Sequence, residues 1–316
     1  MKSTPDQPQY RIAVIGSGAV GCYYGAMLAR HGRDVHFLMR SDLDHVREHG
    51  LRIRSAQGDF HLGEVNAYGT TGEIGPCDLV VIALKATSNG ALDALVPPLL
   101  REGTMLLTLQ NGLGNEEYLA AKFGAERVLG GMCFVCLNRT APGVIEHYGQ
   151  GQIAIGEFGR TPRARIHEVA GEFRSCGVEC RVVESLARET WKKLVWNVPF
   201  NGLAIAGGGI DTGRILASEP LAELARDLMR EVVGVARALG HELPDSLVEE
   251  QITRTEPMGP YKPSSLIDYL DGREVEVEAI WGEAWRQGKD AGAEVGRLET
   301  LYHLIQHLSA KGREAR

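Results

Sequence analysis

The stretch IAVIGSGAVG at residues 12–21 decides the fold. Its first four residues are an apolar, mostly β-branched run typical of a buried parallel strand, and they lead directly into a G-x-G-x-x-G pattern. Residues 22–29, which follow, have a helical composition, and Gly32 is a helix stop signal. The order strand, glycine turn, helix predicts the first half of a β-α-β unit.

Each glycine of this turn has its own mechanical role. Gly16 permits a tight turn, Gly18 lets the backbone approach a pyrophosphate, and Gly21 lets helix and strand pack closely, while the helix N-terminus faces the anion. A second apolar run at residues 34–39 completes the unit. These features predict a Rossmann-type dinucleotide site. Its expected contacts are Gly16, Ser17, Gly18, Ala19, Val20 and Gly21.

The residue at the end of the second run distinguishes between nucleotides. NAD-binding proteins usually place an acidic residue here, on the ribose 2′-hydroxyl, whereas this chain has Arg40. A guanidinium suits a 2′-phosphate, so NADP(H) is predicted in preference to NAD. Two alternatives remain open: Arg40 as an ordinary surface arginine, and Asp42 as a ligand of the ribose.

The remaining periodicity divides the chain in two. Apolar runs at residues 79–84 and 105–109 continue the α/β pattern, and beyond about residue 184 the spacing becomes helical. With 316 residues, two domains are the default expectation. We predict an α/β fold with an N-terminal Rossmann-type NADP-binding domain at residues 1–184. An all-helical domain for substrate and catalysis is expected at residues 185–316.

Composition and charge exclude several functional classes. Hydrophobic residues at 44% and charged residues at 24% are ordinary for a globular protein, and no segment suits a membrane span or a signal peptide, so a cytoplasmic protein is expected. A formal charge of −7 argues against binding to nucleic acid or to anionic lipid.

The six cysteines are expected as free thiols. Because Cys133-x-x-Cys136 falls on a predicted strand, no metal site is predicted.

Polar residues follow two of the predicted strands. Lys85 comes directly after residues 79–84, and Asn111 lies in the sequence Gln-Asn-Gly that follows residues 105–109. Ligands of doubly wound sheets bind at the carboxyl ends of strands. Lys85 is therefore predicted to reach a phosphate, a ribose or a substrate carboxylate, and Asn111 the nicotinamide or the substrate. A solvated lysine and a plain Asn-Gly turn are the alternatives.

A polar stripe opens the helical half. Lys193, Asn197 and Asn201 are spaced by four, which places them on one face of a helix. A lysine shielded from water beside a cofactor can donate a proton to a ketone oxygen, and asparagines can orient a substrate hydroxyl or carbonyl. A solvated stripe is the common alternative, and Pro199 is expected to weaken the helix.

As a set, these motifs resemble the ketopantoate reductase (2-dehydropantoate 2-reductase) family. The motifs are IGSGAVG at 15–21, LKA at 84–86, QNGLG at 110–114, the Lys193 stripe, and KPSS at 262–265 leading to GR-x-x-E at 272–276. Together they span almost the whole chain. The resemblance implies an active site in a cleft between two domains, where NADPH reduces a 2-keto acid. Ketopantoate, reduced to pantoate for pantothenate and coenzyme A biosynthesis, is the favoured substrate.

The resemblance also implies individual roles. Lys193 is the proton donor, and Glu276 lies by the lysine and the nicotinamide, so these two are the catalytic residues. The implied substrate contacts are Asn111, Lys193, Asn197, Asn201 and Ser264. The implied cofactor contacts beyond the glycine loop and Arg40 are Lys85, Asn111 and Glu276. Ser264 is preferred to Ser265 because its distance to Glu276 better fits the family pattern.

One departure widens the choice of substrate. Where the family often carries a further polar contact, this chain has a glycine run followed by Asp211, so a larger or less acidic keto acid is an alternative. A β-hydroxyacid dehydrogenase and a non-catalytic NADP sensor are the rival functions. The sequence leaves open the oligomeric state, a homodimer included, and the order of substrate binding.

Overall fold

The computed structural model describes residues 10–314, which form two compact units. The first unit comprises the residues up to Gln110 together with Asn115–Leu186. The second comprises Asn111–Gly114 together with the residues from Ala187 onward. A single boundary near residue 184 does not describe this division, because the short segment Asn111–Gly114 belongs with the C-terminal helices.

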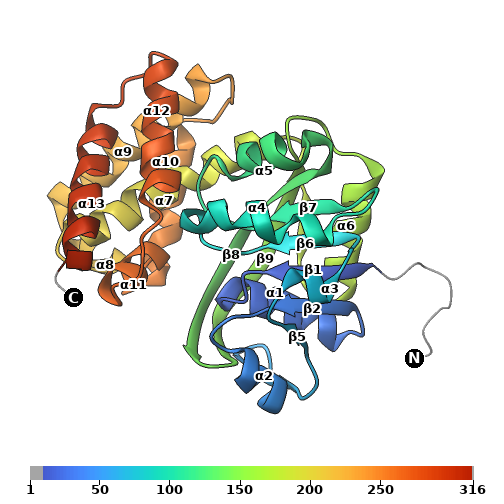
Figure 1. The fold of residues 1–316 in the computed structure, drawn as a ribbon. Helices are drawn as coiled ribbons and strands as arrows, with labels where there is room; N and C mark the ends of the chain where they lie inside the picture. Colours follow the sequence, from blue (N-terminus) through green and yellow to red (C-terminus); the bar gives the residue numbers. More distant parts are fainter. Residues whose placement is uncertain (1–9, 315–316) are drawn as a thin grey trace. The chain divides into compact units, whose positions relative to one another are not determined.

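The first unit is built on one ten-stranded sheet with the order β4-β3-β9-β8-β7-β6-β1-β2-β5, to which β10 adds by pairing with β9 (Figure 1). The strands are β1 (Arg11–Ile15), β2 (Asp34–Leu38), β3 (Leu51–Ser55), β4 (Phe60–Leu62), β5 (Asn66–Tyr68), β6 (Leu79–Ile82), β7 (Met105–Thr108), β8 (Val128–Ala141), β9 (Val144–Glu157) and β10 (Cys180–Val182). Neighbouring strands from β5 to β8 in this order run parallel. The α/β prediction is confirmed.

Helices cover both faces of the parallel strands. They are α1 (Ala19–Arg30), α2 (Leu43–His49), α3 (Thr71–Ile74), η1 (Ala86–Ala91), α4 (Leu92–Leu95), η2 (Pro97–Leu99), α5 (Asn115–Phe123), η3 (Ala125–Arg127) and α6 (Ala164–Ser175). Along β1, Ile12 and Val14 join the cluster that contains α1 and α6, whereas Ala13 and Ile15 join the cluster of α3, α4 and α5. Coverage on both faces explains the continuous apolar runs.

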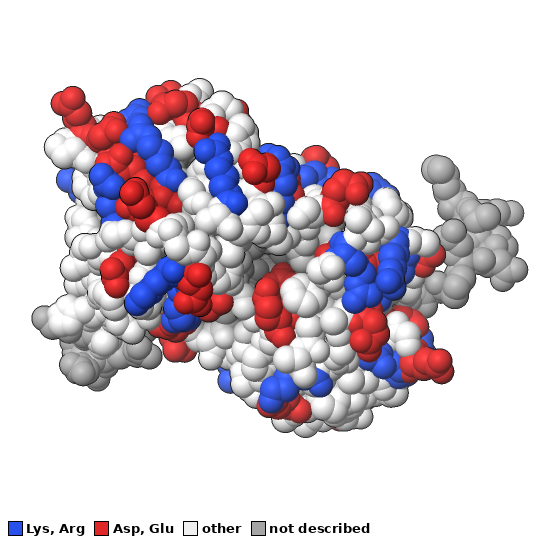
Figure 2. All heavy atoms as spheres, turned by 90° about the horizontal axis from the view of Figure 1, so that it is seen from above, with Lys and Arg blue, Asp and Glu red and all other residues white. Residues whose placement is uncertain are grey.

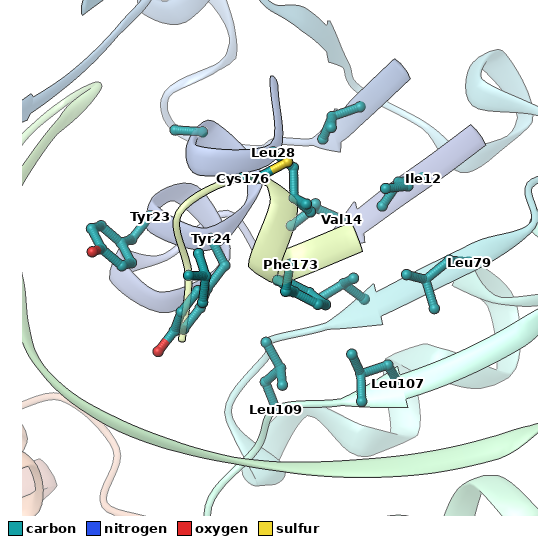
Figure 3. Packing of buried hydrophobic residues seen from close by; sticks show 14 of the residues in the cluster. Ile12, Val14, Tyr23, Tyr24, Leu28, Leu79, Leu107, Leu109, Phe173 and Cys176 are labelled. Atoms are coloured by element: carbon teal, nitrogen blue, oxygen red, sulfur yellow. The ribbon is translucent and has the colours of Figure 1, made fainter. Parts of the chain in front are cut away.

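Aromatic packing fixes α1 against its neighbours. Figure 3 shows Tyr23 and Tyr24 of α1 and Phe173 of α6 near the ends of the central strands. The rings of Tyr24 and Phe173 meet edge to face, with centroids 6.4 Å apart. The ring of Tyr23 lies 4.6 Å from that of His147 on β9. Helix α1, which begins at the glycine loop, is therefore held from several sides.

Strands β8 and β9 form a long antiparallel hairpin whose extent the sequence did not predict (Figure 1). The beginning of β8 pairs with β7, and the beginning of β9 pairs with β3. Gly143 at the hairpin turn lies against α2 and its C-cap, because a Cβ there would be 3.1 Å from the ring of His45 and 2.9 Å from the carbonyl oxygen of Gly50. Since β3, β8 and β9 all contact α1, the hairpin reaches the side of the unit where the nucleotide loop begins.

Within its described residues the second unit has helices and no strand, which confirms the prediction. The helices are α7 (Leu186–Ala206), α8 (Thr212–Ala217), α9 (Glu219–Ala238), α10 (Ser246–Thr255), η4 (Glu256–Met258), α11 (Ser264–Leu270), the π-helix η5 (Glu278–Gly282), α12 (Glu283–Asp290) and α13 (Gly296–Glu314). The core includes Trp191, Val195 and Trp281, all at most 2% exposed.

Helix α7 continues through Pro199, so the expectation of a weakened helix is wrong. Proline removes the N–H that would bond the carbonyl of Val195 and crowds it. Val195, Val198 and Phe200 are completely buried, and the indole nitrogen of Trp281 donates to the Val198 carbonyl at 2.9 Å. Tertiary packing around the proline thus outweighs the local backbone penalty.

Residues 10–314 contain no helix long and apolar enough to cross a membrane. The same residues contain no group of three or more His, Cys, Asp or Glu side chains that could hold a metal ion. All six cysteines lie in this part of the chain and are free thiols. On the face drawn in Figure 2, Lys and Arg are interspersed with Asp and Glu, so that face presents no large field of one sign.

Candidate active site

The glycine loop has the geometry that a dinucleotide pyrophosphate requires. Gly16 has a φ of +98°, and a Cβ there would lie 2.4 Å from the backbone nitrogen of Leu84. A Cβ on Gly21 would lie 2.2 Å from the carbonyl oxygen of Gly16, so helix and loop pack too closely for any side chain. At Gly18 no atom lies within 4 Å of that position, which leaves the backbone open to a ligand.

The first turn of α1 is arranged for an anion. Gly18 is the N-cap and supplies no side-chain cap, and the first turn contains no acidic residue. The backbone amides of this turn therefore remain available for phosphate oxygens. Ser17 joins the loop to the end of β2, because its hydroxyl donates to the carbonyl of Leu38 at 2.6 Å. The residues present thus fit a nicotinamide dinucleotide.

Arg40 and Asp42, which follow β2, have different environments. Arg40 is exposed at the end of the strand. Asp42 is 8% exposed, and its carboxylate accepts hydrogen bonds from Ser41 Oγ at 2.8 Å, Arg139 Nη1 at 2.9 Å and the Gly143 amide at 3.2 Å. These protein donors occupy Asp42, which argues against the alternative that it binds the ribose.

A network of amide side chains lies beyond the ends of β6 and β7. Gln110 Nε2 donates to Asn89 Oδ1 at 2.7 Å, and Asn89 Nδ2 donates to Asn115 Oδ1 at 3.0 Å. Lys85 is the N-cap of η1 in the same region and is half-buried. Sequence reasoning missed Asn89 and Asn115, whose only signal was their place shortly after a strand. Their hydrogen bonds order the edge at which a ligand of this sheet would bind.

In the second unit, Lys193 is held by Asn111. Lys193 Nζ donates to Asn111 Oδ1 at 2.8 Å, which brings together two residues that lie 82 positions apart in the sequence. The segment that carries Asn111 docks on the π-helix η5, because the Leu113 amide donates to the carbonyl of Ala279 at 2.8 Å. Gly112 has a φ of +85°, and a Cβ on it would lie 2.3 Å from the same carbonyl oxygen.

Asn201 links α7 to the start of α11. Its Oδ1 accepts from the Ser265 amide at 3.0 Å, and its Nδ2 donates to the carbonyl of Asn197 at 3.0 Å. Asn201 is 1% exposed and Asn197 is 9% exposed. Of the two serines, Ser265 is buried whereas Ser264 is exposed at the first position of α11. The hydroxyl of Ser264 is therefore the more accessible one.

Glu276 lies two residues before the π-helix η5 and is buried. Its carbonyl accepts from the Ile280 amide at 3.1 Å. A π-turn inside helical structure is uncommon and often occurs at functional sites. Here its Ala279 carbonyl receives the Asn111 segment, so the stretch that begins with Glu276 supports the loop that contacts Lys193.

Asp211 has a structural role. It is the N-cap of α8, and its Oδ1 accepts a hydrogen bond from the Arg214 amide at 2.9 Å. An aspartate at an N-cap satisfies an amide that otherwise has no helical partner. The presence of an acidic residue at this position is therefore explained without a charge directed at the substrate.

Comparison with known proteins agrees with this arrangement of motifs. The family model described as "Ketopantoate reductase PanE/ApbA" matches residues 12–160, and "Ketopantoate reductase PanE/ApbA C terminal" matches residues 185–309. The chain belongs to the ketopantoate reductase family.

Relatives of this family match along almost their whole length. A 2-dehydropantoate 2-reductase from Nostoc sp. (strain PCC 7120) is 38% identical over 310 residues, which cover 96% of each chain. The crystal structure of 2-dehydropantoate 2-reductase from Geobacter metallireducens GS-15 has a TM-score of 0.92 and 45% identity, and covers 94% of this chain and 99% of its own. A dimeric ketopantoate reductase from Staphylococcus aureus, at 20% identity, shares the fold with a TM-score of 0.82 over 95% of this chain and 99% of its own.

Proposed function

We propose that this chain catalyses the NADPH-dependent reduction of 2-dehydropantoate to pantoate, a reaction of pantothenate and coenzyme A biosynthesis. The family and its full-length relatives support the reaction class. The observation that carries the proposal at the level of residues is the hydrogen bond from Lys193 Nζ to Asn111 Oδ1. NADPH, when bound, supplies the hydride that C2 of the keto acid receives.

In this proposal Lys193 is the general acid. Its ammonium group carries three N–H donors, and one of them donates a hydrogen bond to Asn111 Oδ1. The asparagine therefore orients the ammonium group without removing its charge. The lysine gives one proton to the C2 oxygen as that carbon becomes an alcohol carbon. Proton donation from a positioned side chain contributes about 10²- to 10⁴-fold to such a rate. Glu276 is proposed as the acidic residue beside this lysine and the nicotinamide.

The substrate contacts are proposed along one side of α7 and at α11. Asn197 and Asn201 follow Lys193 on α7, and Ser264 is at the first position of α11. Asn201 has one amide hydrogen left after its bond to the Asn197 carbonyl, which allows it to contact a substrate hydroxyl while it fixes α11. The accessible hydroxyl of Ser264 suits the substrate carboxylate.

The cofactor contacts are proposed in the glycine loop and beyond the strand ends. The open backbone at Gly18 and the uncapped first turn of α1 suit the pyrophosphate, and the exposed Arg40 suits the 2′-phosphate. Lys85 and Asn111 are proposed to line the cofactor and substrate site. Since all six cysteines are free thiols, a reducing compartment such as the cytoplasm is part of the same proposal.

The test is an assay of NADPH absorbance with 2-dehydropantoate and a panel of other 2-keto acids. Wild-type protein is expected to turn over 2-dehydropantoate fastest, and Lys193→Ala to lose about 10²-fold or more in kcat with little change in NADPH affinity. Lys192→Ala, which removes the neighbouring lysine, is the matched control and is expected to retain kcat. NADPH binding without turnover of any keto acid would instead favour the non-catalytic sensor.

A homodimer is proposed on the analogy of the dimeric ketopantoate reductase from Staphylococcus aureus. Light scattering during size-exclusion chromatography is expected to give twice the chain mass of 34.4 kDa. A mass of one chain at all concentrations tested would contradict the dimer and leave the catalytic proposal intact.

A further inference from the structure

Arg139, near the far end of β8, reaches the residues that follow β2. Its Nη1 donates to Asp42 Oδ1 at 2.9 Å and lies 3.5 Å from Ser41 Oγ. Ser41 is adjacent to the exposed Arg40, the residue that the sequence favours as the contact of a 2′-phosphate. The β8–β9 hairpin thus brings a second guanidinium, 97 positions away from Asp42 in the chain, to the same loop.

The guanidinium of Arg139 is only partly used by the protein. Its side chain is 42% exposed, and among residues 10–314 its Nε and Nη2 donate no hydrogen bond. A guanidinium presents its donors as a planar fork that fits two oxygens of one phosphate. The bond to Asp42 therefore fixes the orientation of Arg139 while leaving donors for a further anion.

The position of Arg139 also relates to the nucleotide loop. The charges of Asp42 and Arg139 both act on the thiol of Cys22 in the first turn of α1, whose pKa is raised to about 12, chiefly by burial. Ser17 of the loop donates to Leu38 at the end of β2. The start of α1, the loop after β2 and the hairpin therefore meet in one small region of the first unit.

We propose that Arg139 is a second ligand of the adenosine 2′-phosphate of NADPH, and that Asp42 is the positioning residue that holds it beside Arg40. This inference rests on the proposed function, because it assumes that NADPH binds with its adenosine end at this loop. Asp42 repels the 2′-phosphate only weakly, since its carboxylate is paired with Arg139 and also accepts hydrogen bonds from Ser41 and Gly143. The preference for NADP then depends on two cations from distant parts of the chain.

The experiment measures binding by titration calorimetry, with NADPH, NADH, 2′,5′-ADP and 5′-AMP as separate probes. Arg139→Gln is expected to weaken binding of NADPH and 2′,5′-ADP by about tenfold or more, as for the loss of a charge-assisted hydrogen bond to phosphate. Binding of NADH and 5′-AMP is expected to change by less than about twofold, since neither carries the 2′-phosphate. Equal weakening of NADPH and NADH, or no weakening, would overturn the proposal.

Two further variants separate phosphate binding from a structural role. Arg54 pairs with Glu146 between β3 and β9 at 3.0 Å, so Arg54→Gln removes another ion pair of the hairpin region and is expected to leave all four affinities unchanged. The double variant Asp42→Asn with Arg139→Gln replaces the ion pair by two neutral amides and leaves the net charge unaltered. Its NADPH affinity is expected to stay low. Recovery to the wild-type value would overturn the proposal, because it would show that Arg139 acts only by neutralising the carboxylate of Asp42.

Failure of this inference can be told from failure of the proposed function. If wild-type protein binds neither NADPH nor 2′,5′-ADP, the cofactor assignment itself is wrong and the role of Arg139 falls with it. If wild-type protein binds both and turns over 2-dehydropantoate, while Arg139→Gln binds both as tightly as before, only the present inference is refuted.

Discussion

The buried carboxyl of Glu116 makes a sharp prediction about pH and stability. Glu116 lies in the first turn of α5, and its Oε1 and the Cδ2 of Leu186 both lie 2.4 Å from the position that a Cβ on Gly130 would occupy. The carboxyl therefore packs into space that a glycine leaves open. Burial raises the pKa of Glu116 to about 7, its own backbone amide lowers it in part, and Glu117 adds repulsion. The perturbation is Glu116→Gln, which keeps the shape and removes the charge.

The size and sign of the effect of Glu116 on the free energy of unfolding follow from the difference between its pKa in the folded and unfolded states. A rise from 4.5 to about 7 corresponds to at most about 3 kcal/mol, at 1.36 kcal/mol per pKa unit. Since the residue as a whole retains intermediate exposure, solvent screening reduces this to about 1–2 kcal/mol. The folded state binds the proton more tightly, so the contribution to stability is full below about pH 4.5, is lost as the pH rises from there through about 7, and is absent above that.

Urea denaturation at several pH values checks this prediction. Glu116→Gln is expected to be more stable than wild type by about 1–2 kcal/mol near pH 8, and by a few tenths of a kcal/mol near pH 4.5. Glu117→Gln, at the exposed neighbouring position, is the matched control, for which a much smaller gain is expected. A glutamine variant that is no more stable than wild type near pH 8 would refute the argument. Because the chain has two units, both transitions must be fitted.

Three other substitutions test separate parts of the structure. Gly16→Ala places a Cβ against Leu84 in a left-handed backbone conformation, and is expected to cost about 2 kcal/mol or more of stability and to weaken NADPH binding in calorimetry. Asp211→Asn keeps the N-cap of α8 and removes its charge, so KM for 2-dehydropantoate is expected to stay within about twofold; a large fall in KM would indicate repulsion of the substrate. Thr255→Val leaves Trp196 Nε1 without its 2.8 Å acceptor, and is expected to cost about 1–3 kcal/mol in denaturation.

The nucleotide half of the site was largely predictable because its signals are local. Strand, glycine turn and helix follow one another without interruption, and the structure has the expected positive φ at Gly16, close packing at Gly21 and open space at Gly18. The polar stripe on α7 was equally visible, since a spacing of four fixes a helix face wherever the helix lies. These predictions needed no knowledge of long-range pairing.

Features that depend on distant residues could not be predicted. No local pattern indicates that Asn111 pairs with Lys193, or that Arg139 reaches Asp42, because both contacts result from the folding of separate segments. The preference for Ser264 over Ser265 came from the family's spacing to Glu276, and the different burial of these two adjacent serines has no local signal in the sequence. At Pro199 a correct local rule failed because burial on all sides stabilises α7.

The segment Asn111–Gly114 has a consequence for dividing this protein into fragments. The chain leaves the first unit after Gln110, docks Leu113 on Ala279 of the second, and returns at Asn115 before it finally crosses at Leu186. A fragment that begins at Ala187 would lack these four residues, and the Ala279 carbonyl would lose its Leu113 donor. Cutting the gene once near residue 186 therefore does not yield two self-sufficient modules, because the C-terminal module would need the segment Asn111–Gly114 to be supplied as a peptide or joined to it as part of the same fragment.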